Sequence, residues 1–256
     1  MSRRDDVNML YSKSTKLNDW CQILFCSNCV FSILSLLFDG ILNNTGILMQ
    51  ILTSIIYVIL KSIDDGHYWY RAESARRKDN LQVALGINLS DYETDGYYNN
   101  SLKPSISKYA MNTFESNFFS KELSTKMFVN SLIKAILAVL LLISIGWFKP
   151  DQGVILIITQ AVLSTYIVEE TIMLALYKSK LEKLYALIYA EFITVGITKE
   201  SQQALLLSYV IEYEATKAHY KVRISTFLFE RYNNELSKKW GEIESKCKTK
   251  DRLIKS

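Results

Sequence analysis

The sequence has few residues that interrupt helices. Only two prolines and nine glycines occur among its 256 residues. These two residue types disfavour a helix interior more than any others, so few positions force a helix to end. Leu, Ile and Lys are abundant among the rest. The composition therefore predicts an all-α protein.

Motifs for catalysis are also missing. The chain contains no GxxxxGK[ST] or GxGxxG phosphate-binding pattern and no HExxH zinc pattern. Its two histidines, His67 and His219, are far apart in sequence, and no Ser/His/Asp or Cys/His set has a supporting context. We therefore expect no enzyme activity, no cofactor and no metal site.

Four cysteines are present. Cys21, Cys26 and Cys29 follow the spacing C-x4-C-x2-C, which resembles part of a plant-type iron–sulfur pattern. They lie in or beside an apolar run, however, and Cys247 is far away near the C-terminus. We expect these cysteines to pack as small apolar side chains.

Charge is nearly absent from four long runs, at residues 20–38, 41–60, 127–148 and 153–177. The first two contain no Asp, Glu, Lys or Arg. At 1.5 Å per residue, the shortest run extends about 28 Å, close to the thickness of a bilayer's hydrocarbon core. Short turns join the first run to the second and the third to the fourth. The pattern predicts four transmembrane helices in two hairpins. The alternative is four core helices of a soluble protein.

The predicted organisation has five parts: a cytoplasmic N-terminal segment (1–19), a first transmembrane hairpin (20–60), a cytoplasmic helical insert (61–126), a second transmembrane hairpin (127–177) and a cytoplasmic C-terminal helical domain (178–256). Of the 30 Lys and Arg residues, 28 fall on the side of the termini and the insert. Because basic residues stay on the cytoplasmic side, both termini are predicted to be cytoplasmic.

The C-terminal domain is predicted to break near residues 195–198. A new helix then starts at Thr198 or Ser201. It carries an apolar stripe that needs burial, formed by Leu205, Leu206, Tyr209, Val210 and Tyr213. The stripe can pack on the central insert, on another subunit or on both, and it favours an oligomer.

A few polar residues interrupt the last two runs, and ionisable groups there usually face a partner, water or a pathway. Lys134, Gln160, Glu169 and Glu170 are our candidates for a pore wall or gate. Lys134 has the reach to pair with either carboxylate. Alternatively, Lys134 extends to the membrane surface, the fourth helix ends before Glu169, and Gln160 makes an interhelical hydrogen bond.

A basic cluster follows the second run. Arg71, Arg76, Arg77 and Lys78 are candidate ligand-binding residues, because arginine donates paired hydrogen bonds to phosphate. The alternatives are contacts with anionic lipid headgroups or with neighbouring acids.

The layout resembles the SMODS-associated four-transmembrane effectors of bacterial anti-phage (CBASS/Hailong-type) defence systems. The resemblance rests on two hairpins around a central insert and on LYSK at 10–13, RAE followed by RR in 71–77, GYYNN at 96–100 and FESNFFSK at 114–121. It implies a homo-oligomer, for example a tetramer, that permeabilises the bacterial inner membrane. It also implies control by a nucleotide or oligonucleotide messenger from a partner nucleotidyltransferase.

Two other functions fit the same sequence. One is a non-conducting membrane scaffold that docks a cytoplasmic partner through the C-terminal helices. The other is a small transporter, which is disfavoured because the sequence lacks inverted repeats with helices broken by Gly or Pro.

Overall fold

The structure is a computed structural model, and it describes all residues except 1–3, 99, 101, 149–166, 196–199 and 255–256. The described chain is helical apart from one pair of two-residue strands. It divides into two compact units. We call Asp6–Ser74 with Ser131–Thr171 the polar-cored unit, and Met1–Asp5, Ala75–Asn130 and Ile172–Ser256 the aromatic-cored unit. The predicted all-α class is confirmed.

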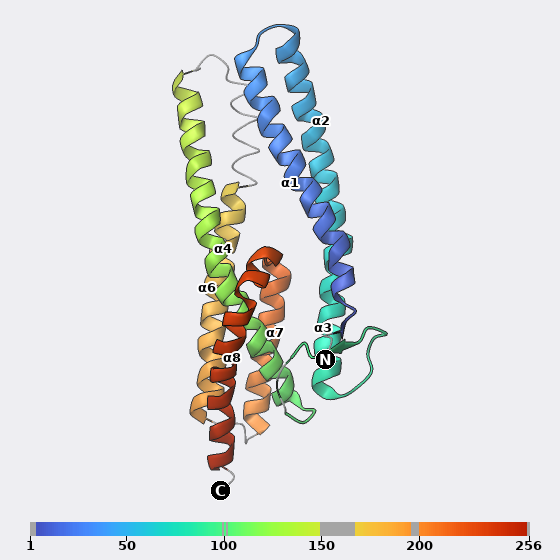
Figure 1. The fold of residues 1–256 in the computed structure, drawn as a ribbon, viewed down its shortest axis with the longest axis vertical. Helices are drawn as coiled ribbons and strands as arrows, with labels where there is room; N and C mark the ends of the chain where they lie inside the picture. Colours follow the sequence, from blue (N-terminus) through green and yellow to red (C-terminus); the bar gives the residue numbers. More distant parts are fainter. Residues whose placement is uncertain (1–3, 99, 101, 149–166, 196–199, 255–256) are drawn as a thin grey trace. The chain divides into compact units, whose positions relative to one another are not determined.

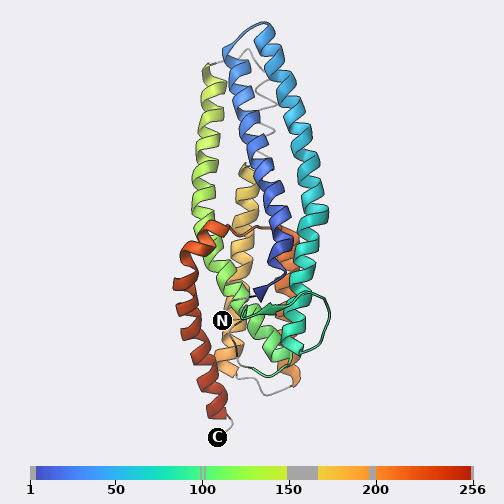
Figure 2. The ribbon, with the colours of Figure 1, turned by 45° about the vertical axis from the view of Figure 1, so that its right-hand side comes forward.

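The polar-cored unit contains an antiparallel pair of helices, α1 (Asn8–Leu37) and α2 (Ile41–Ile63), which lie side by side in Figures 1 and 2. The turn between them passes through Gly40, whose φ of 73° suits glycine. The helix α2 continues through a π-helical turn, η1 (Asp64–Tyr68), into α3 (Trp69–Leu85). The charge-free run at 20–38 is thus the later part of a longer helix.

The third predicted span belongs to α4 (Ile106–Phe148), a helix of 43 residues. The fourth is described only from residue 167, and α6 (Glu169–Ala190) then continues towards the C-terminal domain. Within the polar-cored unit, the hydroxyls of Ser131 on α4 and Thr171 on α6 lie 2.7 Å apart. These two helices are therefore in contact at that level.

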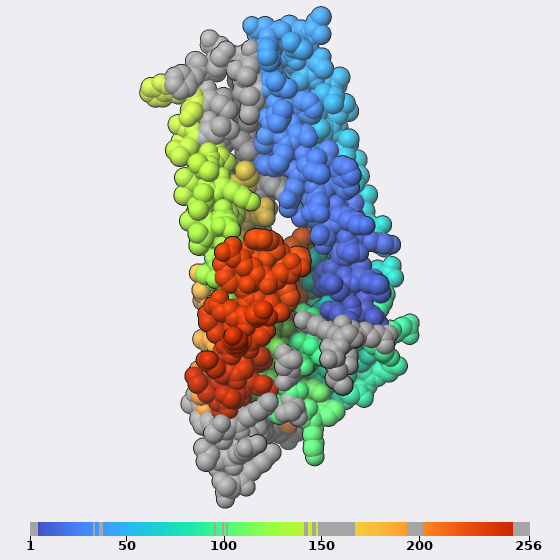
Figure 3. Space-filling model, viewed as in Figure 1, coloured from blue at the N-terminus to red at the C-terminus, as the bar shows by residue number. Residues whose placement is uncertain are grey.

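The aromatic-cored unit is built from parts of α4 and α6, followed by η3 (Glu191–Val195), α7 (Glu200–Tyr220) and α8 (Thr226–Ile254). Phe114 lies at the centre of its core. The Phe114 ring stacks on Phe192 with centroids 5.8 Å apart and meets Trp240 edge-on at 5.1 Å. In the space-filling view α8 forms an outer face of this unit (Figure 3).

Three of the five residues in the predicted stripe on α7 are buried inside the same chain, whereas Leu205 is exposed and Tyr209 is half-buried. Leu206, Val210 and Tyr213 are each almost fully buried, and the Tyr213 hydroxyl lies 3.3 Å from the Ser120 hydroxyl on α4. The stripe thus packs on the central insert, and it no longer argues for an oligomer. Residues 196–198 of the predicted helix break lie outside the described residues; on either side of residues 196–199, η3 ends at Val195 and α7 begins at Glu200.

A glycine in the left-handed region follows the end of α3. Gly86, with φ of 68°, follows Leu85, and its N–H donates to the Gln82 carbonyl at 2.9 Å. An unpredicted strand pair lies beyond it: β1 (Arg4–Asp5) runs antiparallel to β2 (Thr94–Asp95). The pair anchors the N-terminal segment within the aromatic-cored unit.

Candidate functional site

The helix α2 is apolar outside and polar inside. Its buried residues are Gly46, Gln50 and Thr53. Its exposed residues between positions 46 and 60 are all apolar: Leu48, Met49, Ile51, Leu52, Ile55, Ile56, Val58 and Ile59. This is the reverse of the pattern on a helix that faces water on its outer side.

Two described helical stretches are long and apolar enough to cross a membrane, Ile41–Leu85 and Ile106–Leu140. Core helices of soluble proteins can pass the same test when they are buried. Here only 17% and 22% of the respective apolar windows are buried. Such large exposed apolar surfaces indicate a lipid or protein partner.

Polar groups hold α1 against α2. The Asn28 amide nitrogen lies 3.0 Å from both the Gln50 carbonyl oxygen and the Thr53 hydroxyl, and 2.8 Å from the Ser54 hydroxyl. Gly46 allows close approach, because a Cβ at this position would lie only 3.0 Å from the Ser35 Cβ. Small residues at the contact and polar side chains across it are typical of helix pairs in membranes.

The predicted pore residues fall in the polar-cored unit, apart from Gln160, which lies outside the described residues. Lys134 is exposed on α4, and Glu169 and Glu170 are exposed at the start of α6. The charges of Lys134 and Lys61 both act on the Glu170 carboxylate. The structure thus brings the lysine of the third run close to a carboxylate of the fourth, one of the two that the sequence offered it.

Sequence reasoning missed Lys61 as a member of this charged group. Lys61 is the first charged residue after the second apolar run, and its ammonium group also lies 3.5 Å from the Asp65 carboxylate. Its position at the edge of that run, comparable to the position of Glu170, was the available signal. The group therefore draws on α2, α4 and α6.

Two of the four predicted ligand-binding residues are engaged by acids of the same chain. The Arg76 guanidinium donates to both Asp5 carboxylate oxygens at 2.9 and 3.0 Å and lies 4.2 Å from the centre of the Tyr97 ring. Arg77 Nε lies 2.7 Å from Glu214 Oε2. These contacts correspond to the neighbouring acids that the sequence left as an alternative.

Arg71 and Lys78 remain exposed on α3. They are seven residues apart on one helix, which places them on the same face. They are the two members of the basic cluster whose side chains are open to solvent or to a ligand.

Asp79 completes the network around Arg76, a role that no pattern in the sequence indicated. Its side chain is fully buried, accepts a hydrogen bond from the Thr94 hydroxyl and lies 3.6 Å from Arg76. Burial raises the pKa of Asp79, and the Thr94 hydrogen bond and the Arg76 charge oppose that rise. This network links the N-terminal strand, α3 and the loop that carries β2.

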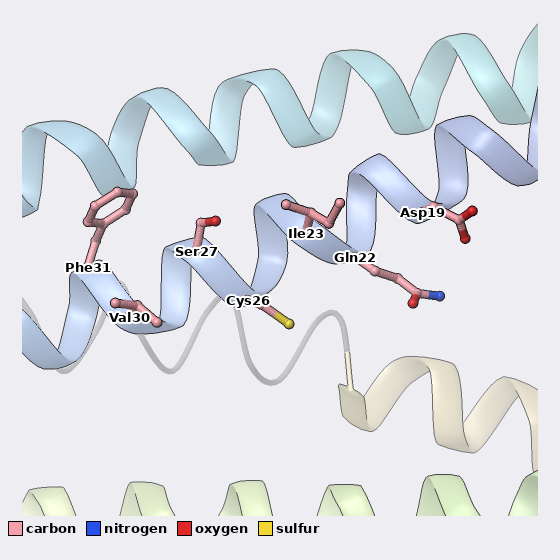
Figure 4. A pocket seen from close by; sticks show the side chains of 7 residues that line it. All are labelled: Asp19, Gln22, Ile23, Cys26, Ser27, Val30 and Phe31. Atoms are coloured by element: carbon pink, nitrogen blue, oxygen red, sulfur yellow. The ribbon is translucent and has the colours of Figure 1, made fainter.

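A hollow of about 550 Å³ lies along one side of α1. Its described lining comes from this helix alone (Figure 4): Asp19, Gln22, Ile23, Cys26, Ser27, Val30 and Phe31. Of the cysteines, Cys21 and Cys247 are buried, as expected for small apolar side chains, whereas Cys26 is exposed. Asp19 is the only Asp, Glu, Lys or Arg in the described lining, so the pattern of charged residues in the sequence did not mark this face.

Comparison with known proteins adds no relative: no family model, curated protein or solved structure matches the chain. What the fold defines is an all-helical protein with two helices that are able to cross a membrane.

Proposed function

We propose that this chain is a four-span protein of the bacterial inner membrane with both termini in the cytoplasm. The observation that carries this proposal is the exposed apolar surface of α2 over a polar contact with α1. Contact of this apolar surface with water costs free energy, whereas contact with lipid tails does not. The described end of the fourth span and the run at 20–38 complete two helical hairpins in this proposal.

The proposed activity is that of an effector in anti-phage defence. Copies of the chain assemble into an oligomer that conducts ions, depolarises the membrane and arrests or kills the infected cell. Support comes from Lys61, Lys134 and Glu170, because ionisable groups beside apolar helices usually meet water or one another. An assembly with a hydrated centre supplies that water.

The proposed control is a nucleotide or oligonucleotide made by a partner nucleotidyltransferase. Arg71 and Lys78 are its candidate contacts, since both are exposed and cationic. Arg76 and Arg77 instead shape the surface around them through Asp5 and Glu214.

Membrane potential after induced expression tests the pore. The wild type is compared with Glu169→Gln/Glu170→Gln at matched membrane levels, and Glu235→Gln serves as the control because Glu235 is an exposed acid on α8. We expect depolarisation by the wild type and the control and its loss in the double variant. If all three proteins depolarise the membrane, the pore proposal stands, but Glu169 and Glu170 are not needed for conduction.

Co-expression with a neighbouring nucleotidyltransferase tests the control. We expect it to change the depolarisation caused by the wild type and to have a weaker effect on Arg71→Gln/Lys78→Gln. If membrane-inserted wild type never depolarises cells, with or without that partner, the pore proposal is wrong. The non-conducting scaffold is then favoured.

A further inference from the structure

The helix α1 carries polar residues on two opposite faces. One face meets α2 and contains Ser14, Asn28, Ser32 and Ser35, all buried. The second face, which we call the outer stripe, consists of Ser12, Thr15, Asp19, Gln22 and Cys26, all exposed. Their spacing of three, four, three and four residues keeps these side chains on one line along a helix.

The outer stripe differs from the rest of the apolar surface. Between positions 46 and 60 of α2, polar residues are buried or half-buried and only apolar residues are exposed. On α1, by contrast, Gln22 and Cys26 are exposed inside the charge-free run, one and two turns beyond Asp19. Exposed polar side chains also occur at Thr45 of α2 and at Asn130 and Lys134 of α4. The outer stripe is distinguished from them by its line of five such residues, three of which border the hollow.

An exposed amide or carboxylate is unfavourable against lipid tails, since it loses hydrogen bonds that water supplied. Figure 4 shows Asp19, Gln22 and Cys26 projecting from the side of α1 opposite to α2, and these residues line the hollow described above. The outer stripe is therefore polar, and three of its residues border the hollow.

We propose that the outer stripe lines the cytoplasmic half of the ion pathway, an inference that rests on the proposed pore function. In an oligomer, one Asp19 from each copy forms an acidic ring that concentrates cations at the inner mouth. Gln22 and Cys26 line the next two turns. Val30 follows on the hollow, so the pathway becomes apolar towards its outer half, as in pores that close by excluding water.

Cys26 provides a direct test, because a cationic methanethiosulfonate reagent reacts with thiols that contact water. The full-length protein carries Cys29→Ser and Cys247→Ser, which leaves Cys26 and the buried Cys21. It is reconstituted in phospholipid vesicles, and K⁺ flux is recorded before and after the reagent. The control is the same protein with Cys26→Ser, compared with its own flux before the reagent. We expect loss of most of the flux only when Cys26 is present.

A second variant tests the role of charge. Asp19→Asn is expected to lower the permeability of cations relative to anions, and Glu235→Gln is expected to leave this ratio unchanged. If flux is present but the reagent and Asp19→Asn both leave it unaltered, the outer stripe does not line the pathway and the pore proposal stands.

Two further outcomes separate the possibilities. Oxidative crosslinking of Cys26 between copies, in vesicles whose flux resists the reagent, shows that the outer stripe is a contact between subunits and overturns the inference. Absence of flux from every preparation, with the reconstituted partner nucleotidyltransferase present or absent, overturns the pore proposal together with this inference.

Discussion

The Asn28 amide nitrogen on α1 donates a hydrogen bond of 2.8 Å to the Ser54 hydroxyl on α2. The Thr53 hydroxyl and the Gln50 carbonyl each lie 3.0 Å from the same nitrogen. An amide has two hydrogens, so the three acceptors share them. One polar side chain of α1 thus contacts three groups of α2 and favours a single register of the helix pair.

Asn28→Ala is expected to destabilise the helix pair by about 1 kcal/mol, the usual size of an interhelical hydrogen bond in a membrane. The measurement is reversible unfolding of the full chain in mixed micelles with increasing SDS. Ile56→Ala is the matched control, because Ile56 is exposed on α2. Equal losses in the two variants would show that the Asn28 contacts contribute nothing specific.

Substitution of Gly46 tests the close approach of α1 and α2. A Cβ at Gly46 would lie 3.0 Å from the Ser35 Cβ and 3.3 Å from the Phe31 carbonyl oxygen, so the helices must separate. We expect Gly46→Ala to lower stability by about 1 kcal/mol or more. At Gly66 a Cβ meets nothing within 4 Å, and Ala is the better helix former. In thermal unfolding in detergent, Gly46→Ala should therefore lower the melting temperature and Gly66→Ala should raise it. A change of the same sign in both variants would contradict the close contact.

The ion pair between Arg77 and Glu214 joins α3 to α7 inside the aromatic-cored unit. Both side chains are partly buried, with 29% and 17% exposure, and their charged atoms lie 2.7 Å apart. Arg77→Gln and Glu214→Gln, separately and together, form a double-mutant cycle, and we expect a coupling energy of about 1 kcal/mol in thermal or denaturant unfolding. If the effects of the two substitutions on stability are additive within error, the ion pair does not stabilise the contact between α3 and α7.

Asp79 predicts a dependence of stability on pH. Burial raises its pKa in the folded protein above the ordinary value of 3.8, so the folded state binds the proton more tightly than the unfolded state does. Ionisation therefore lowers stability as pH rises from the unfolded pKa through the folded pKa, and acidification within that window restores it.

Asp79→Asn carries no such titration. Thermal unfolding between about pH 4 and pH 7 should show that the stability of the variant increases relative to that of the wild type as pH rises. The control is Asp91→Asn, at an exposed position in the loop after α3. A difference between wild type and Asp79→Asn that stays constant over this range would contradict the raised pKa.

Several features followed from the sequence because their causes are local. The scarcity of Pro and Gly predicted an all-α protein, and the described chain is helical apart from one pair of two-residue strands. The apolar runs likewise marked stretches able to cross a membrane, two of which the described helices contain. Each signal is read within a few turns of one helix, where hydrogen bonding and backbone geometry decide the outcome.

Other features depended on neighbours that are distant in the chain. The partner of Arg76 is 71 residues away and that of Arg77 is 137 residues away, so the sequence pattern showed a basic cluster and not its neutralisation. The partner of the α7 stripe is also distant in the chain, because Tyr213 lies against Ser120 of α4. This packing within one chain removes one of the reasons to expect an oligomer.

The amino-acid sequence by itself determined that the chain is helical and which stretches avoid charge, because backbone preference and hydrophobicity are properties of each residue and its near neighbours. Only the tertiary structure decided which face of each helix is buried. Packing against α2 hides Asn28 and leaves Gln22 and Cys26 exposed on the other side of α1, a distinction that depends on the position of a second helix.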